Sequence, residues 1–269
     1  MHRQVSINSL CLAPAPLAAQ VEAVARLGAC ALTPVIDAVL EAGPAAAAAH
    51  VRDAGLEVAA ITHMSFGFAD AATTRAARER LARTIDAAAQ IGAQSIVMTT
   101  GGRGSLTWPQ AAVAFAEAVA PCAEAARAAG MRLGIEGTSH LYADASIAHR
   151  LADTTTLARL AGVDVVLDTF ACWFDADIDA AIVEAGPYLA LVQVSDYAPG
   201  DRSLPCRAVP GDGICGLNRL IPAMAATGFG GYYDIEVIGP RLAEQGIDAG
   251  LTRAAAFIGA LLDGKDQDA

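Results

Sequence analysis

The sequence lacks an apolar run long enough to cross a membrane, and it has few positive charges. Although 54% of its residues are hydrophobic, charges interrupt every apolar stretch before the roughly 18 residues that a membrane span needs. It carries 18 Lys and Arg against 29 Asp and Glu, a formal net charge of −11. Such an acidic chain has no broad attraction to nucleic-acid phosphates or anionic membranes. We therefore expect neither as a partner.

Paired cysteines are also missing. The six cysteines lie far apart, with no Cys-x-x-Cys pair and no cluster with histidine at zinc-finger spacing. The N-terminal residues run directly into a strand-like segment, without the apolar stretch and small-residue cleavage site of a secretory signal. These absences predict reduced thiols, mostly in the core, and a soluble cytoplasmic protein.

Short β-rich segments alternate with longer Ala-rich segments of helical period, which is typical of repeated βα units. Eight such units fit in the 269 residues and predict one (β/α)8 TIM barrel over residues 1–269. Apolar helix faces also permit a homodimer. The expected strands are Val5–Ser9, Ala31–Ile36, Val58–Thr62, Ser95–Thr99, Arg132–Glu136, Val165–Asp168, Leu191–Val194 and Tyr232–Val237.

Glycines mark where the expected helices end. Each follows a helical run and precedes a strand, the position at which a left-handed C-cap favours glycine. Seven of the eight helix-to-strand junctions carry this signature. They are Gly28, Gly55, Gly92, Gly130, Gly162, Gly186 and Gly228. The longest loop is expected from Tyr197 to Gly216, and so long a loop in a compact domain is usually functional.

Four late strands end in side chains that carry oxygen donors: Glu136, Asp168, Gln193 and Glu236. In such barrels the carboxyl ends of the strands carry the catalytic groups. Each donor follows apolar neighbours, so an isolated carboxylate there would be costly unless it is paired or bound to a metal. An all-oxygen set suits a hard divalent ion such as Mn²⁺ or Mg²⁺ better than Zn²⁺.

With these residues in place, the sequence resembles the sugar phosphate isomerase/epimerase superfamily of xylose-isomerase-like barrels over nearly its whole length. The resemblance is carried by Ile135-Glu136-Gly137, Leu167–Trp173, Val192–Asp196, Arg207–Gly213 and Asp234-Ile235-Glu236. It implies that Glu136, Asp168, Gln193 and Glu236 bind one divalent metal, most often Mn²⁺, with Mg²⁺ or Co²⁺ as alternatives. It also implies that the two glutamates act as acid and base.

Two positions depart from that family. Many relatives have histidine where Gln193 stands, and many have a substrate-binding histidine where this chain has Ala171. The first change keeps a ligand, with a hydrogen-bonding wall residue as the alternative role for Gln193. The second weakens a simple ketose 3-epimerase assignment.

Other polar side chains are candidates because they follow strand ends. His63 and His140 are placed to move protons near neutral pH, although loop histidines are more often merely solvated. Arg103, in a Gly-rich loop, and Arg207 are candidates for contacting substrate, and for Arg207 the alternative is a salt bridge to Asp212 or Asp196. Trp173 is a candidate wall for a sugar face.

These residues predict a metal-dependent isomerase or epimerase acting on a sugar, keto-sugar or polyol through a metal-stabilised enediolate. Loss of a β-substituent from the same intermediate would instead give a lyase or dehydratase acting on a 3-oxo-sugar or glycoside. Five histidines and an acidic chain argue against a multi-zinc phosphodiesterase like endonuclease IV. A non-catalytic, sugar-binding accessory barrel remains an alternative, favoured by Ala171 and disfavoured by the glutamate pair.

Overall fold

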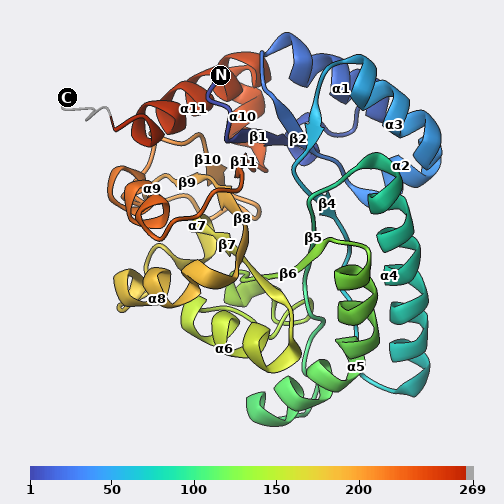
Figure 1. The fold of residues 1–269 in the computed structure, drawn as a ribbon. Coiled ribbons are helices and arrows are strands. Elements are labelled where there is room, and N and C mark those ends of the chain that lie inside the picture. The colour runs from blue at the N-terminus through green and yellow to red at the C-terminus, as the bar shows by residue number, and fades with distance from the viewer. Residues whose placement is uncertain (265–269) are drawn as a thin grey trace.

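The computed structural model describes residues 1–264, in which parallel strands form a ring inside a layer of helices (Figure 1). Residues 265–269 of the expected domain lie outside this range. The barrel strands are β1 (Val5–Asn8), β2 (Ala31–Thr33), β3 (Glu57–Val58), β4 (Ile61–Thr62), β5 (Ser95–Met98), β6 (Arg132–Glu136), β7 (Asp164–Asp168), β8 (Leu189–Val194) and β11 (Tyr233–Ile235). All eight expected strand segments are confirmed as barrel strands, so the fold class is the expected TIM barrel.

The ring closes through the third strand segment, which is split in two. The order within residues 1–264 is β3-β2-β1-β11-β8-β7-β6-β5-β4. β3 pairs with β2 and β4 pairs with β5, so the two pieces of one segment join the ends of the sheet. The break falls at Ala59 and Ala60, both of which lie in the barrel interior. Their small side chains let two successive residues face inward there.

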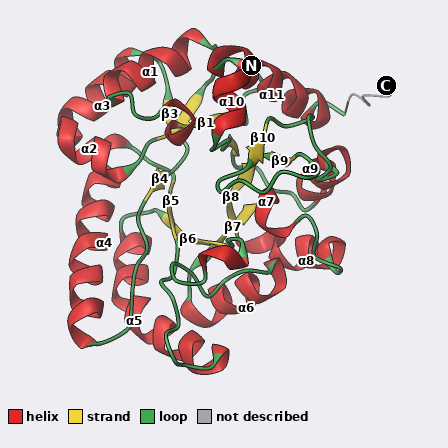
Figure 2. Cartoon of the chain, turned by 180° about the vertical axis from the view of Figure 1, so that it is seen from behind, coloured by secondary structure: helices red, strands yellow, loops and turns green. Residues whose placement is uncertain are grey.

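The helices surround the strands, as the view from behind also shows (Figure 2). Short helices follow β2, β7 and β11 at the barrel mouth: α2 (Ile36–Ala42), α7 (Thr169–Cys172) and α10 (Pro240–Gln245). The other helices are α1 (Leu17–Arg26), α3 (Pro44–Asp53), α4 (Ala71–Ile91), α5 (Trp108–Ala128), α6 (Leu151–Ala161), α8 (Ile178–Ala185), α9 (Leu217–Ala226) and α11 (Ile247–Leu262). Three 3-10 turns within residues 1–264 complete the set: η1 (Ser9–Leu12), η2 (His140–Tyr142) and η3 (Gly186–Tyr188).

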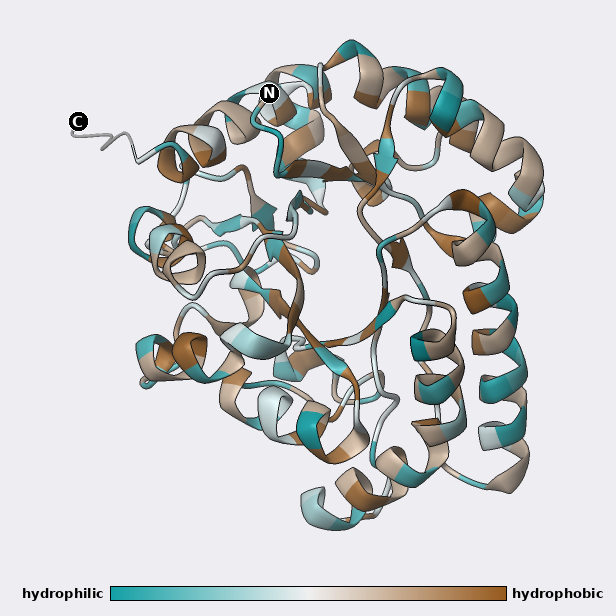
Figure 3. Cartoon of the chain, viewed as in Figure 1, coloured by the Kyte–Doolittle hydropathy of each residue, from teal (hydrophilic) through white to brown (hydrophobic). Residues whose placement is uncertain are grey.

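Apolar side chains form two separate cores. The larger lies between strands and helices, and in Figure 3 the helices correspondingly show both hydrophobic and hydrophilic stripes. The smaller fills the inside of the barrel with compact side chains, namely Ala31, Ala59, Ala60, Val97, Val166 and Leu191. Filling the interior makes the barrel a packed core rather than a pore, so any site must lie above this layer.

Six of the seven expected glycine caps have the left-handed backbone that the sequence predicts, with φ between 65° and 84°. The expectation is wrong for Gly186, whose φ is −42° and which continues into η3. A Cβ there would lie 2.7 Å from the Cβ of Thr227. Close packing, rather than a positive φ, therefore explains this glycine.

The expected loop from Tyr197 to Gly216 contains an antiparallel pair, β9 (Asp196–Tyr197) and β10 (Arg207–Ala208), which places Arg207 beside the barrel mouth. The Asp196 carboxylate holds this segment by accepting backbone N–H groups of Tyr197, Gly211 and Cys215 at 2.9–3.1 Å. Asp196 is thus an anchor for the turn that carries Arg207.

The cysteine expectation is confirmed, since all six are free and Cys30 alone is exposed. Within residues 1–264, no helix is both long and apolar enough to cross a membrane.

Candidate functional site

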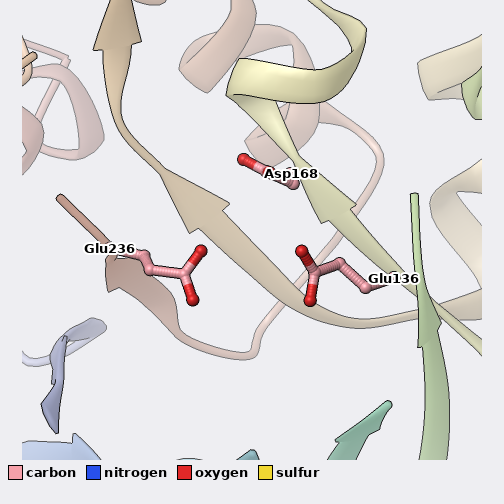
Figure 4. Close-up of side chains that lie close together, drawn as sticks. All are labelled: Glu136, Asp168 and Glu236. Atoms are coloured by element: carbon pink, nitrogen blue, oxygen red, sulfur yellow. The ribbon is translucent and has the colours of Figure 1, made fainter. Parts of the chain in front are cut away.

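Three carboxylates converge at the carboxyl ends of the late strands. Glu136 ends β6, Asp168 ends β7, and Glu236 directly follows β11. One oxygen from each lies within 4.8 Å of those from the other two. In Figure 4 the two glutamates face each other from opposite sides, with Asp168 above and between them. We call these three side chains the carboxylate cluster.

Strand register explains why the cluster forms. Asp168 pairs with Gln193 on β8, and Gln193 pairs with Asp234 on β11, so these three lie at one level of the barrel. Glu236 lies two residues beyond Asp234, and side chains two apart on a strand face the same side. The register therefore brings Asp168, Gln193 and Glu236 together, and Glu136 pairs with Val166, two residues before Asp168 on β7.

Arg207 lies against the cluster. Its guanidinium donates two hydrogen bonds to Asp168, at 2.9 Å to Oδ1 and 2.7 Å to Oδ2, and lies 3.2 Å from Glu236 Oε2. Although burial opposes its charged form, Asp168 and Glu236 raise the pKa of Arg207 above its ordinary value. The two alternatives considered from the sequence, salt bridges to Asp212 or Asp196, are wrong, because Arg253 pairs with Asp212 and backbone amides satisfy Asp196.

Burial and mutual repulsion change the acidity of the glutamates. Burial, followed by the charges of Glu236 and Asp168, raises the pKa of Glu136 well above its ordinary value. Burial also raises the pKa of Glu236, against the lowering influence of Arg207. Two carboxyls with raised pKa values at one site are suited to holding and moving protons near neutral pH.

Gln193 provides the clearest sign that the site takes a ligand. Its side chain is fully buried, and neither its amide oxygen nor its nitrogen has a hydrogen-bond partner within the described residues. An unpaired buried amide is costly, and a cation bound to the amide oxygen would satisfy one of its two polar atoms. Together with the carboxylate cluster, Gln193 fits a hard divalent cation such as Mn²⁺ or Mg²⁺.

Below the cluster lies a further buried acid, Asp234, which was not predicted as a site residue from the sequence. Its carboxylate accepts hydrogen bonds from Ser6 at 2.6 Å, Thr33 at 2.9 Å and Asn8 at 3.0 Å. Asn8 also donates to Glu236 Oε1 at 3.3 Å. Asp234 therefore orients Asn8, and Asn8 orients Glu236.

His63 is placed differently from the expectation that it overhangs the cluster. Its ring lies against helix α4, with Nδ1 2.8 Å from Thr84 Oγ1. Burial, with the charge of Arg80, lowers its pKa to about 4. The other ring nitrogen, Nε2, is buried without a hydrogen-bond partner, and no hydrogen bond joins the ring to the cluster within residues 1–264.

The other expected site residues lie around the mouth. His140 begins η2 and is exposed, and Arg103 is exposed in the loop after β5. Trp173, at the end of α7, stacks on Tyr197 with ring centroids 6.1 Å apart. The Arg207 guanidinium lies 5.1 Å from the centre of the neighbouring Phe170 ring. Tyr197 also contacts Phe170, so an aromatic chain links Trp173 to Arg207.

Two further residues near the site, Asn8 and Tyr142, were not predicted from the sequence. Asn8 ends β1 and was detectable by the same strand-end rule that selected the acids. Tyr142 lies in η2, and burial raises its pKa while the charges of Arg207, Asp168 and Glu136 all act on it. No sequence pattern marks Tyr142, because the turn that brings it near those charges is irregular.

Comparisons with known proteins identify the family and the fold. Residues 21–257 match a family described as xylose isomerase-like TIM barrel. Protein SMc04130 from Sinorhizobium meliloti 1021 is 26% identical, with a TM-score of 0.86 over 94% of this chain and 96% of that chain. No curated protein matches the sequence.

Two more distant solved structures share the fold. A D-psicose 3-epimerase, solved in the presence of D-fructose, is 19% identical, with a TM-score of 0.82 over 96% of this chain and 99% of that one. An IOLI protein with a bound zinc atom is 13% identical, with a TM-score of 0.82 over 98% of this chain and 99% of that one.

Proposed function

The chain belongs to the xylose isomerase-like TIM barrel family, and we propose from this membership and from its site that it is a divalent-metal-dependent isomerase or epimerase of a small sugar, keto-sugar or polyol. The observation that carries the proposal is the convergence of Glu136, Asp168 and Glu236 within 4.8 Å beside the unpaired Gln193 amide. These four residues would hold the ion, with Mn²⁺ preferred over Mg²⁺ or Co²⁺.

The glutamates carry the proton transfer in this proposal. They face one another across the cluster, so a substrate carbon between them is exposed to one carboxyl on each side (Figure 4). One removes a proton from the carbon next to a carbonyl, and the other returns a proton to the resulting enediolate. When bound, the metal supplies Lewis-acid stabilisation of the negative charge that develops on the substrate oxygens.

Neighbouring residues prepare the pair for that task. Asn8 donates to Glu236 Oε1 at 3.3 Å and so fixes one carboxylate from below. The carboxylate of Glu136 makes no hydrogen bond or salt bridge within the described residues, and Glu136 is only half-buried. This leaves Glu136 the more accessible of the two, and we propose it as the group that first meets the substrate.

The mouth supplies the substrate contacts. Trp173 stacked on Tyr197 offers an aromatic face, and Arg103 and His140 are exposed on loops above the barrel. Ala171 is buried and offers no side-chain donor. We propose that substrate hydroxyls are contacted from His140 and Arg103 instead.

Deuterium incorporation from solvent tests the proposal. Protein stripped of metal is incubated in D₂O with a panel of ketoses and 3-oxo-glycosides, with and without added Mn²⁺. We expect Mn²⁺-dependent exchange into at least one compound, reduced about 10²- to 10⁴-fold in Glu136→Gln and Glu236→Gln. Glu244→Gln, an exposed change on α10, is the matched control and should leave exchange unaltered.

The products separate the related reactions. Reprotonated sugar identifies an isomerase or epimerase, whereas an unsaturated product identifies elimination. Exchange that survives in both glutamate variants would exclude these side chains as the acid and base.

A further inference from the structure

Arg207 is bound to the same oxygens that a metal ion would use. It donates to both oxygens of Asp168, at 2.9 and 2.7 Å, and its Nη2 lies 3.2 Å from Glu236 Oε2. Its Nη1 also donates to Ser195 at 3.1 Å. The three side chains are almost wholly enclosed, at 11% exposed for Arg207, 1% for Asp168 and 4% for Glu236.

Enclosure makes this pairing energetically necessary. A carboxylate removed from water is costly without an opposite charge, and here two acids share one cation. Within residues 1–264, Arg207 is the one cationic side chain that pairs with Asp168 or Glu236. An arginine suits the task, because its guanidinium stays charged and its planar fork matches a carboxylate.

The segment that carries Arg207 holds it at the cluster. Arg207 lies in β10, which pairs with β9, and Asp196 fixes the following turn through backbone N–H groups of Gly211 and Cys215. Phe170 offers a second contact for the guanidinium, at 5.1 Å from the ring centre. The Phe170 ring is therefore a second surface in contact with the guanidinium.

We propose that Arg207 is a built-in counter-cation of the metal site, which neutralises Asp168 and Glu236 in the metal-free protein and competes with the entering divalent cation for their oxygens. The inference rests on the proposed function in taking the carboxylate cluster as the metal site. It adds that one arginine lowers the affinity for the ion and stabilises the fold without it.

Two opposite effects follow from removing this charge. A positive charge within a few ångströms should lower the affinity of the site for another cation by about one to three powers of ten. Arg207→Met should therefore bind Mn²⁺ at least about tenfold more tightly than the unaltered protein. The same change leaves buried acids unpaired when metal is absent, so the metal-free variant should melt at least about 5 °C lower.

The experiment titrates the chelator-treated full chain with Mn²⁺ alone, by calorimetry or by electron paramagnetic resonance of free Mn²⁺. Melting temperatures are recorded with and without saturating Mn²⁺. Arg207→Lys keeps the charge but loses the bidentate contact, so its Mn²⁺ affinity should lie between those of the unaltered protein and Arg207→Met. Arg150→Met is the matched control, because Arg150 also lies near two aspartates, Asp177 at 2.6 Å and Asp175 at 3.9 Å, but outside the cluster.

The expected result is tighter Mn²⁺ binding and a lower metal-free melting temperature in Arg207→Met, with Mn²⁺ restoring the melting temperature. Equal or weaker Mn²⁺ binding in Arg207→Met would overturn the proposal, as would a matching gain in Arg150→Met. If Arg207→Met does not fold without metal, Arg207→Gln refolded with and without Mn²⁺ gives the same comparison.

Failure of this inference is distinguishable from failure of the proposed function. Mn²⁺ that binds all variants equally, together with glutamate-dependent deuterium exchange, rejects the counter-cation and keeps the enzyme. Tight Mn²⁺ binding in Arg207→Met without any exchange rejects the isomerase and keeps the counter-cation. If no variant binds Mn²⁺, the counter-cation proposal is rejected. The deuterium-exchange assay then decides separately whether the protein is an isomerase or epimerase.

Discussion

The two sides of the barrel mouth differ in the charge of the side chains that face inward. Strands β6, β7 and β11 bring acids: Glu136, Asp168, Asp234 and Glu236. Strands β1 and β2 bring neutral donors instead, namely Ser6, Asn8 and Thr33, all of which bond to Asp234. The side that carries the acids is thus held in place by the side that has none.

The two sides also differ in how fully their polar groups are paired. The side chains of Ser6, Asn8 and Thr33 on β1 and β2 all donate hydrogen bonds to Asp234. By contrast, the Glu136 carboxylate has no partner in residues 1–264, and Gln193 has both amide atoms unpaired. The unpaired groups at the cluster, Glu136 and Gln193, are ones that a bound ligand would satisfy.

Breaking the link between the two sides at Asp234 should give the largest effect on stability. Asp234→Leu leaves the buried donors of Ser6, Asn8 and Thr33 without their acceptor, and we expect the free energy of unfolding to fall by about 3–5 kcal/mol. Urea unfolding of the metal-free protein measures it. Thr33→Val removes one donor and should cost about 1 kcal/mol; equal losses for both variants would contradict the supporting role.

The pH dependence of stability tests whether His63, in the first half of the barrel, is held as a buried neutral ring. Burial lowers its pKa from 6.5 to about 4, so the unfolded chain takes up a proton there at a pH where the folded chain does not. The free energy of unfolding should therefore be undiminished by His63 above pH 6.5. It should fall by about 3 kcal/mol as the pH is lowered from 6.5 toward 4.

The measurement compares unfolding free energies from pH 7 to pH 4 for the unaltered protein and His63→Gln. The variant should lack this part of the pH dependence. Identical slopes in the two proteins would show that His63 is not held neutral by the fold.

The turn that carries Arg207 should be sensitive to a single methyl group. A Cβ on Gly213 would clash with Asp196 Oδ1 and with the Tyr197 carbonyl oxygen. Gly213→Ala should therefore cost about 2 kcal/mol and expose the segment to limited proteolysis. Gly200→Ala changes an exposed glycine of the same segment with open space around it, although its positive φ adds strain. Greater protease sensitivity in Gly200→Ala would argue against Asp196 as the anchor.

Residues on the rim should have the smallest effect. Arg103 and His140 are exposed on neighbouring loops, which follow the paired strands β5 and β6, so Arg103→Ala and His140→Ala should leave stability unaltered. We expect about a threefold rise in KM, or about 0.6 kcal/mol, for whichever loop contacts the substrate. A fall in kcat instead would place that side chain at the reacting carbon.

Local sequence signals were sufficient for much of the fold and for the acids. Alternating strand and helix periods predict the strands, because side chains two apart on a strand and three or four apart on a helix share one face. The rule that acids at strand ends meet at the barrel mouth correctly selects Glu136, Asp168 and Glu236, which converge within 4.8 Å. Gly186 shows the limit of such signals, since its reason is a distant neighbour, Thr227.

The sequence by itself determined that this chain is a barrel with oxygen donors at its late strand ends, because those features follow from periodicity along the chain. The tertiary structure alone decided which groups meet them. Arg207 reaches Asp168 across 39 residues through an irregular hairpin, and His63 turns toward Thr84 on α4. Such contacts depend on side-chain direction and loop conformation, which no local pattern of residues encodes.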